Sequence, residues 1–227
     1  SLLPLEQAGR APGVYEPARE WLLTDMDELY RGIYTRTGTG TAEVLAICSA
    51  VAGEGKTTTC LGLAVTIAQD FPERRVLLVE ADLARPVLAN DFGLEPIPGL
   101  ADCIMTGEPL HAAYRATLLD NLHLVPAGGP VNAGRVLRST RMASLVDTMR
   151  ESYDIVILDT AALLGNSDSL LLTDLADGVI FVVRANVTPA HLVQKAIEQL
   201  DDGKLRGVVL NGTRSAVPGW LRRLGGF

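Results

Sequence analysis

The stretch AVAGEGKTT, residues 50–58, decides the fold because of what lies on either side of it. The apolar run Val44–Cys48 before it has the length of a buried strand, and Thr57–Gln69 after it has apolar residues at helical spacing. A strand, a glycine-rich turn and a helix in this order are the setting that a phosphate-binding loop requires. Gly53 and Gly55 let the backbone amides turn towards phosphate oxygens, and the following helix N-terminus adds partial positive charge.

Particular side chains of this loop are candidates for binding a nucleotide. Lys56 is placed to reach the β- and γ-phosphates, and the Thr57 hydroxyl is a ligand type that Mg²⁺ accepts. Glu54 and Thr58 are the remaining residues of this loop that we expect to contact the nucleotide. The loop as a whole predicts ATP or ADP with Mg²⁺ as the cofactor. The general pattern begins with glycine, whereas this chain has Ala50. The competing interpretation is a glycine-rich turn with a chance lysine, but motif and context agree on the phosphate loop.

Apolar strand runs and helical segments alternate outside the loop, which predicts an α/β fold. Short strands separated by helices indicate a doubly wound, mainly parallel sheet with helices on both faces. The predicted strands are Val44–Cys48, Val76–Val79, Leu122–Val125, Ile155–Leu158, Val179–Val183 and Val208–Leu210. The predicted helices are Thr57–Gln69, Leu100–Met105, Thr140–Arg150, Ser169–Leu175 and Pro189–Leu200.

The pattern divides the chain into three parts. Residues 1–40 form a proline-containing arm with a short helical pattern over Trp21–Tyr34. Residues 41–214 form the predicted nucleotide-binding domain, and residues 215–227 form a tail.

Composition excludes several classes of protein. The chain has 227 residues, a formal net charge of −7 and 5 % aromatic residues, which disfavours a nucleic-acid partner. Because 48 % of the residues are hydrophobic, a large core is feasible, and no apolar run is long enough to predict a membrane-spanning helix. Cys48, Cys60 and Cys103 show no metal-ligand spacing, and we expect them to be buried thiols in a reducing compartment.

Acidic residues end two of the predicted strand runs, LLVEAD at 77–82 and IVILD at 155–159. In doubly wound sheets, ligands collect at the carboxyl ends of the strands. Asp159 follows four apolar residues, as an acid that holds Mg²⁺ does in phosphate-loop proteins. Glu80 and Asp82 alternate along one extended segment, so we expect them to face the same side and to orient or deprotonate an attacking hydroxyl.

Together, these motifs resemble the bacterial tyrosine kinases of capsule and exopolysaccharide export, the CpsD/CapB/Wzc-type cytoplasmic autokinases of the MinD/ParA-like superfamily. The resemblance runs from about Thr41 to Arg214. Its most specific part is LLVEADLARP (77–86), which is similar to a second acidic motif of that family. It is also carried by SAVAGEGKTTT (49–59), YDIVILDTAALL (153–164), GLADCIMTGEPL (99–110), LHLVPAGGPVNAGRVLRSTRM (122–142) and ADGVIFVVRANVT (176–188).

The resemblance implies transfer of the ATP γ-phosphoryl group to tyrosine, with roles for particular residues. Lys56, Glu80, Asp82 and Asp159 are the implied catalytic residues. Thr57, Asp82 and Asp159 are the implied metal ligands, and Asn211 falls where related ATPases contact adenine. Glu28 and Arg31 resemble part of a motif used in ring assembly.

The family also implies partners and a location. The expected partner is the cytoplasmic segment of a Wzz-like membrane polysaccharide co-polymerase, and a homo-oligomer is expected. The chain would then be cytoplasmic and held at the inner face of the plasma membrane through that partner.

Departures from the family pattern keep two alternatives open. Glu80 stands where the family has aspartate, Ala161 and Ala162 replace a proline pair, and Arg135 occupies a position that is often acidic. No tyrosine follows Tyr153, which is expected to pack beside the preceding strand run, whereas the family ends in a tyrosine cluster.

One alternative is therefore a nucleotide-binding pseudokinase that regulates a co-polymerase. The other is a MinD/ParA-like ATPase, although Val51 stands where those proteins have an extra lysine. Tyr15, Tyr30 and Tyr34 remain possible acceptors, with packing roles favoured for the last two.

Overall fold

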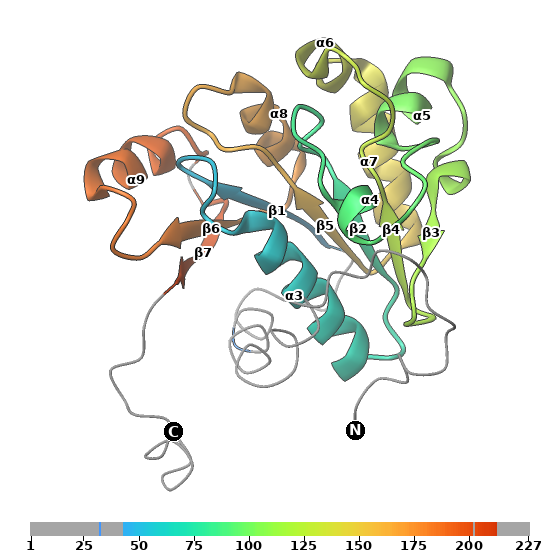
Figure 1. Ribbon diagram of the computed structural model, residues 1–227, viewed down its shortest axis with the longest axis horizontal. Helices are drawn as coiled ribbons and strands as arrows, with labels where there is room; N and C mark the ends of the chain where they lie inside the picture. The colour runs from blue at the N-terminus through green and yellow to red at the C-terminus, as the bar shows by residue number, and fades with distance from the viewer. Residues whose placement is uncertain (1–31, 33–42, 202, 213–227) are drawn as a thin grey trace, which may run out of the picture.

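The computed structural model describes residue 32, residues 43–201 and residues 203–212. The predicted helix over 21–34, apart from Gly32, and the predicted tail over 215–227 lie outside the described residues. The part of the chain that is described forms one sheet with helices packed on its two faces (Figure 1).

The sheet has the strand order β3-β4-β2-β5-β1-β6-β7, and every pair of neighbours is parallel except β3 with β4. This arrangement confirms the predicted doubly wound, mainly parallel α/β fold. The strands are β1 (Glu43–Ser49), β2 (Val76–Glu80), β3 (Arg115–Ala116), β4 (Leu122–Val125), β5 (Ile155–Asp159), β6 (Gly178–Arg184) and β7 (Leu205–Asn211).

The helices divide between the two faces of the sheet, and each face has its own apolar core. Helices α3 and α4 pack on one face through residues such as Leu63, Ile67 and Leu88. The other face is covered by α5 to α9, through residues such as Met142 and Leu172. The helical elements are α3 (Lys56–Asp70), α4 (Leu88–Asp91), α5 (Leu100–Thr106), η1 (Leu110–Ala113), α6 (Ala133–Leu137), α7 (Thr140–Ser152), α8 (Ser167–Leu175) and α9 (Ala190–Ile197).

Within residues 43–212, the strands and helices predicted from the sequence are all present, with ends that differ by a few residues. Strands β1, β2, β5 and β6 are one or two residues longer than predicted and β7 is four residues longer, because each continues into a polar residue that apolar patterning does not include. Four elements of five residues or fewer are present without having been predicted: α4, η1, β3 and α6. Such short elements carry too little periodicity to be recognised.

Chain connections bring the ends of three strands together at one edge of the sheet. The α3 connection carries the chain from β1 past β5 to β2, and the α8 connection carries it from β5 past β1 to β6. Asp159 at the end of β5 is therefore in register with both Ile47 of β1 and Glu80 of β2. A ligand crevice is expected at such a reversal of strand order.

The buried residues include all three cysteines, as the sequence predicts. Burial raises the pKa of the Cys48 thiol to about 12, so this thiol stays protonated. Tyr153 is also buried, directly before β5. In the described part of the chain, no helix combines the length and the apolar character needed to cross a membrane.

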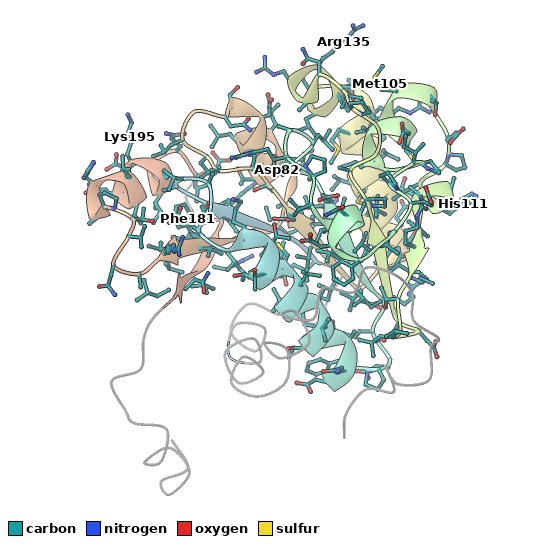
Figure 2. The ribbon with its side chains drawn as sticks, viewed as in Figure 1. Asp82, Met105, His111, Arg135, Phe181 and Lys195 are labelled. Carbon is teal, nitrogen blue, oxygen red and sulfur yellow. The ribbon has the colours of Figure 1, made fainter. Side chains whose placement is uncertain are left out.

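Phe181 tests the core on the side of the sheet that α5 to α9 cover. Its side chain lies on β6 and is fully buried (Figure 2). We expect Phe181→Ala to lower the free energy of unfolding by about 3–5 kcal/mol, because it removes apolar contacts and leaves a cavity. Urea denaturation measures this change.

Phe181→Leu is the matched control, because it keeps most of the buried volume and should cost less than half as much. Equal losses for the two variants would contradict the assigned packing.

Candidate functional site

The loop between β1 and α3 has the backbone conformation of a phosphate cradle. Gly53 and Gly55 have φ angles of 81° and 93°, a region that side-chain-bearing residues rarely adopt. A Cβ at Gly55 would also lie 2.0 Å from the Asn211 side-chain nitrogen, so the Asn211 side chain would have to move. Both predicted glycines therefore have a physical reason to be glycine.

Lys56 is buried at the first position of α3 and folds back along the loop. Its Nζ donates a hydrogen bond to Ser49 Oγ at 3.2 Å, and Ser49 Oγ donates to the Val51 carbonyl at 2.7 Å. The lysine is thus held beside the loop, where phosphates would be bound. Ser49 is not among the predicted site residues, although it directly precedes residues 50–58.

Thr57 and Asp159 are brought together from positions 102 residues apart. The Thr57 hydroxyl donates to Asp159 Oδ2 at 2.6 Å. Asp159 Oδ1 is buried, and no described residue forms a hydrogen bond with it. Burial raises the pKa of Asp159 to about 6, while the Thr57 hydrogen bond and the Lys56 charge lower it in part.

A hydroxyl beside a carboxylate with one unused oxygen is a donor set that fits Mg²⁺. This ion keeps several waters and is usually bound through one or two carboxylates together with phosphate oxygens. Within the described residues, no group of three or more His, Cys, Asp or Glu side chains could hold a metal by itself. The donors therefore suit a metal that shares its coordination with a nucleotide.

Glu54 lies in the middle of the loop, but its carboxylate points into the protein and is 1 % exposed. Oε2 accepts from the Val51 amide at 2.8 Å. Oε1 accepts from the Arg184 amide at 3.0 Å and from the Thr188 hydroxyl at 2.5 Å. The residue therefore fastens the phosphate loop to the end of β6, and its carboxylate is committed to these three donors.

Asn211, the last residue of β7, lies against the same loop. Its side-chain nitrogen donates to the Glu54 carbonyl at 2.9 Å. The structure thus brings the predicted adenine-side residue to the phosphate loop across 157 positions in sequence.

Glu80 has contacts that differ from the sequence expectation. It is buried at the end of β2, where Oε1 accepts from the Val87 amide and, at 2.6 Å, from the Leu88 amide. Oε2 accepts from the Ala127 amide at 3.1 Å. Both oxygens therefore hold backbone segments after β2 and β4, and the role of Glu80 towards an attacking hydroxyl stays a prediction. The expectation that Glu80 and Asp82 face the same side assumed a strand that continues through both residues. However, β2 ends at Glu80 and the chain then turns.

Asp82 lies in that turn, at the edge of the sheet where the phosphate loop also lies (Figure 2). Its carboxylate accepts a hydrogen bond from the Arg85 amide at 3.2 Å and lies 3.9 Å from the Arg85 guanidinium. Thr58 is exposed on the first turn of α3. The roles of Asp82 and Thr58 in binding a nucleotide or metal stay predictions.

A parallel sheet with a strand, a glycine loop and a helix around Lys56 and Thr57 defines a phosphate-loop nucleotide-binding protein. A family model described as "AAA domain" matches residues 42–204. The chain is 34 % identical over 171 residues to the tyrosine-protein kinase YwqD of Bacillus subtilis, covering 74 % of this chain and 71 % of that protein. It therefore belongs to the bacterial tyrosine kinase family.

Two further similarities agree with this assignment. The succinoglycan biosynthesis transport protein ExoP of Rhizobium meliloti is 33 % identical over 178 residues, which cover 76 % of this chain. This chain spans only 22 % of the length of ExoP. Among solved structures, the VpsO kinase domain has a TM-score of 0.78 and 28 % identity, with 88 % of this chain and all of that domain covered.

Glu54 provides a test of how the loop is held. Glu54→Gln keeps the shape but replaces one accepting oxygen with a donor, so a buried amide loses its partner at a cost of about 1–3 kcal/mol. We expect a lower free energy of unfolding and about tenfold weaker binding of a fluorescent ADP analogue.

Glu198→Gln makes the same chemical change at an exposed residue directly after α9 and should leave both quantities unchanged. Combining Glu54→Gln with Thr188→Val should give less than the sum of the single effects, because both act on one hydrogen bond. Unaltered ADP binding in Glu54→Gln would contradict the role assigned to Glu54.

Proposed function

We propose that this chain is an ATP- and Mg²⁺-dependent protein-tyrosine kinase of exopolysaccharide or capsule biosynthesis. The observation that carries the proposal is the Thr57–Asp159 pair beside the phosphate loop, in a chain of the bacterial tyrosine kinase family. Phosphoryl transfer depends on positioning and charge stabilisation rather than on covalent chemistry by the protein. The site contains groups that can position a nucleotide and groups that can stabilise its charge.

The residues of this chain would divide the work as follows. Amides of the loop around Gly53 and Gly55 bind the β- and γ-phosphates, and Lys56 leaves Ser49 to contact them. Thr57 and Asp159 hold Mg²⁺, which, when bound, neutralises charge on the β- and γ-phosphates. Asn211 fixes the loop on the side where the base is expected.

The acceptor tyrosine oxygen then attacks the γ-phosphorus in line, and the bond to the β–γ bridging oxygen breaks to release ADP. The proton of the tyrosine hydroxyl is proposed to go to Asp82, because both oxygens of Glu80 are engaged by backbone amides. Of the two acids predicted for this role, Glu80 and Asp82, only Asp82 is therefore proposed to accept the proton.

A nucleotide-gated regulator without kinase activity is the second candidate function. One observation favours it: backbone amides engage both oxygens of the Glu80 carboxylate. In this reading, the bound nucleotide alters assembly, and no phosphoryl group is transferred.

The proposed setting follows from the relatives. ExoP is named as a transport protein of succinoglycan biosynthesis, and this chain corresponds to about a fifth of it. We propose that the chain acts in the cytoplasm, as a homo-oligomer, on or beside the cytoplasmic segment of a membrane polysaccharide co-polymerase.

Incubation with ATP and Mg²⁺, followed by intact mass measurement and phosphotyrosine mapping, tests the proposal. The reaction includes the cytoplasmic segment of a candidate co-polymerase as a second acceptor. We expect a phosphate on tyrosine in the wild type and none in Lys56→Met, because the lysine charge at the β- and γ-phosphates is lost.

Lys195→Met removes an exposed lysine on α9 and serves as the matched control. Bound nucleotide without any phosphotyrosine would reject the kinase and support the regulator.

A further inference from the structure

A polar pocket of about 440 Å³ lies between α6 and the start of α8. Residues 132–138 line one side of it and residues 165–168 line the other. It is distinct from the nucleotide cradle, because none of its lining residues belongs to the loop 49–58.

The backbone connects this pocket directly to the phosphate loop. The Leu163 amide donates to the Ser49 carbonyl at 2.9 Å, and the Leu164 amide donates to the Ala50 carbonyl at 3.1 Å. The next residue, Gly165, already lines the pocket. A molecule that lies in the pocket and extends along this segment therefore reaches the phosphate loop.

The one acidic residue among the described residues that line this pocket, Asp168, is already paired with Arg138. Arg138 donates to Ser167 Oγ at 2.9 Å and to Asp168 Oδ1 at 3.3 Å. The oxygens of Asn132 and Asn166 are also engaged, since each accepts from a backbone amide at the start of α6 or α8. These contacts leave the pocket with one uncompensated charge.

That charge is Arg135. Its side chain is exposed on α6 and extends away from the ribbon (Figure 2). Among the described residues, no acid pairs with its guanidinium and no acceptor binds it. Two arginines against one aspartate make the pocket locally positive in a chain whose net charge is −7.

The described tyrosines are poorly placed to be acceptors. The rings of Tyr114 and Tyr153 pack edge to face at 5.5 Å, and both contact His123. Burial raises the pKa of both hydroxyls. Tyr153 precedes β5, whereas Asp159 ends it, so this cluster lies towards the opposite edge of the sheet. An acceptor must therefore be delivered to the phosphate loop from elsewhere.

We propose that the pocket binds carboxylates of an acidic segment of another polypeptide that presents the acceptor tyrosine, with Arg135 as the specificity-determining residue. The proposal rests on the proposed kinase function. A guanidinium binds carboxylates through paired, charge-assisted hydrogen bonds. Because the whole chain is acidic, a local positive pocket is what aligns an acidic segment with the phosphate loop.

Binding of short labelled peptides, followed by fluorescence anisotropy at low salt, tests this pocket. One peptide has a single tyrosine flanked by glutamates, and two others have glutamines or lysines in those places. Arg135→Glu should weaken binding of the glutamate peptide by about five- to tenfold and strengthen binding of the lysine peptide. The effect should shrink at high salt, because the charges are exposed.

Lys195→Glu is the matched control, since it reverses an exposed charge on α9, away from the pocket. Both variants should bind a fluorescent ADP analogue like the wild type, which shows that they are folded. In the kinase assay, Arg135→Glu should raise KM for the glutamate peptide and leave kcat unchanged.

The outcomes separate this inference from the proposed function. If Arg135→Glu binds and phosphorylates the glutamate peptide like the wild type, the pocket proposal is overturned and the kinase stands. If the wild type phosphorylates no peptide, but Arg135→Glu still loses affinity for the glutamate peptide, the kinase is overturned and the acidic-segment site stands.

Discussion

The hydrogen bond between Thr57 and Asp159 is the contact on which the site depends. It joins the first turn of α3 to the last residue of β5 and is possible only because β1 and β5 are parallel neighbours. The register that pairs Ile47 with Asp159 places the carboxylate directly beside the helix start. The sheet order, the loop after β1 and the buried carboxylate are therefore parts of one arrangement, and a changed strand order would separate them.

Glu54 shows how this arrangement is held in shape. A buried carboxylate is costly unless it is fully hydrogen-bonded, and Glu54 meets this condition with two backbone amides and one hydroxyl. The side-chain amide of Asn211 also donates a hydrogen bond to the backbone carbonyl of Glu54. Because protein groups hold the loop on both sides, the entropic cost of ordering it when a nucleotide binds is reduced.

Local patterns were enough to predict every described strand except β3, the glycine turn before α3 and the position of Asp159 at the end of β5, because each depends on a few neighbouring residues. Contacts between distant segments could not be predicted. Thr188 donates a hydrogen bond to Glu54 across 134 positions in sequence. The hydrogen-bond partners of Glu80 depend on where the chain turns after β2. Arg135 was recognised as a departure from the family pattern, but only the fold shows that it lies in a pocket between α6 and the start of α8.

The most direct measurement of the central claim is the affinity for ATP with and without Mg²⁺, in the wild type and in Asp159→Asn. The account predicts that Mg²⁺ strengthens ATP binding to the wild type by about tenfold or more. Asp159→Asn is expected to lose most of this gain while still binding metal-free ATP, because a neutral amide binds Mg²⁺ more weakly than a carboxylate does. An undiminished effect of Mg²⁺ in Asp159→Asn would contradict the account.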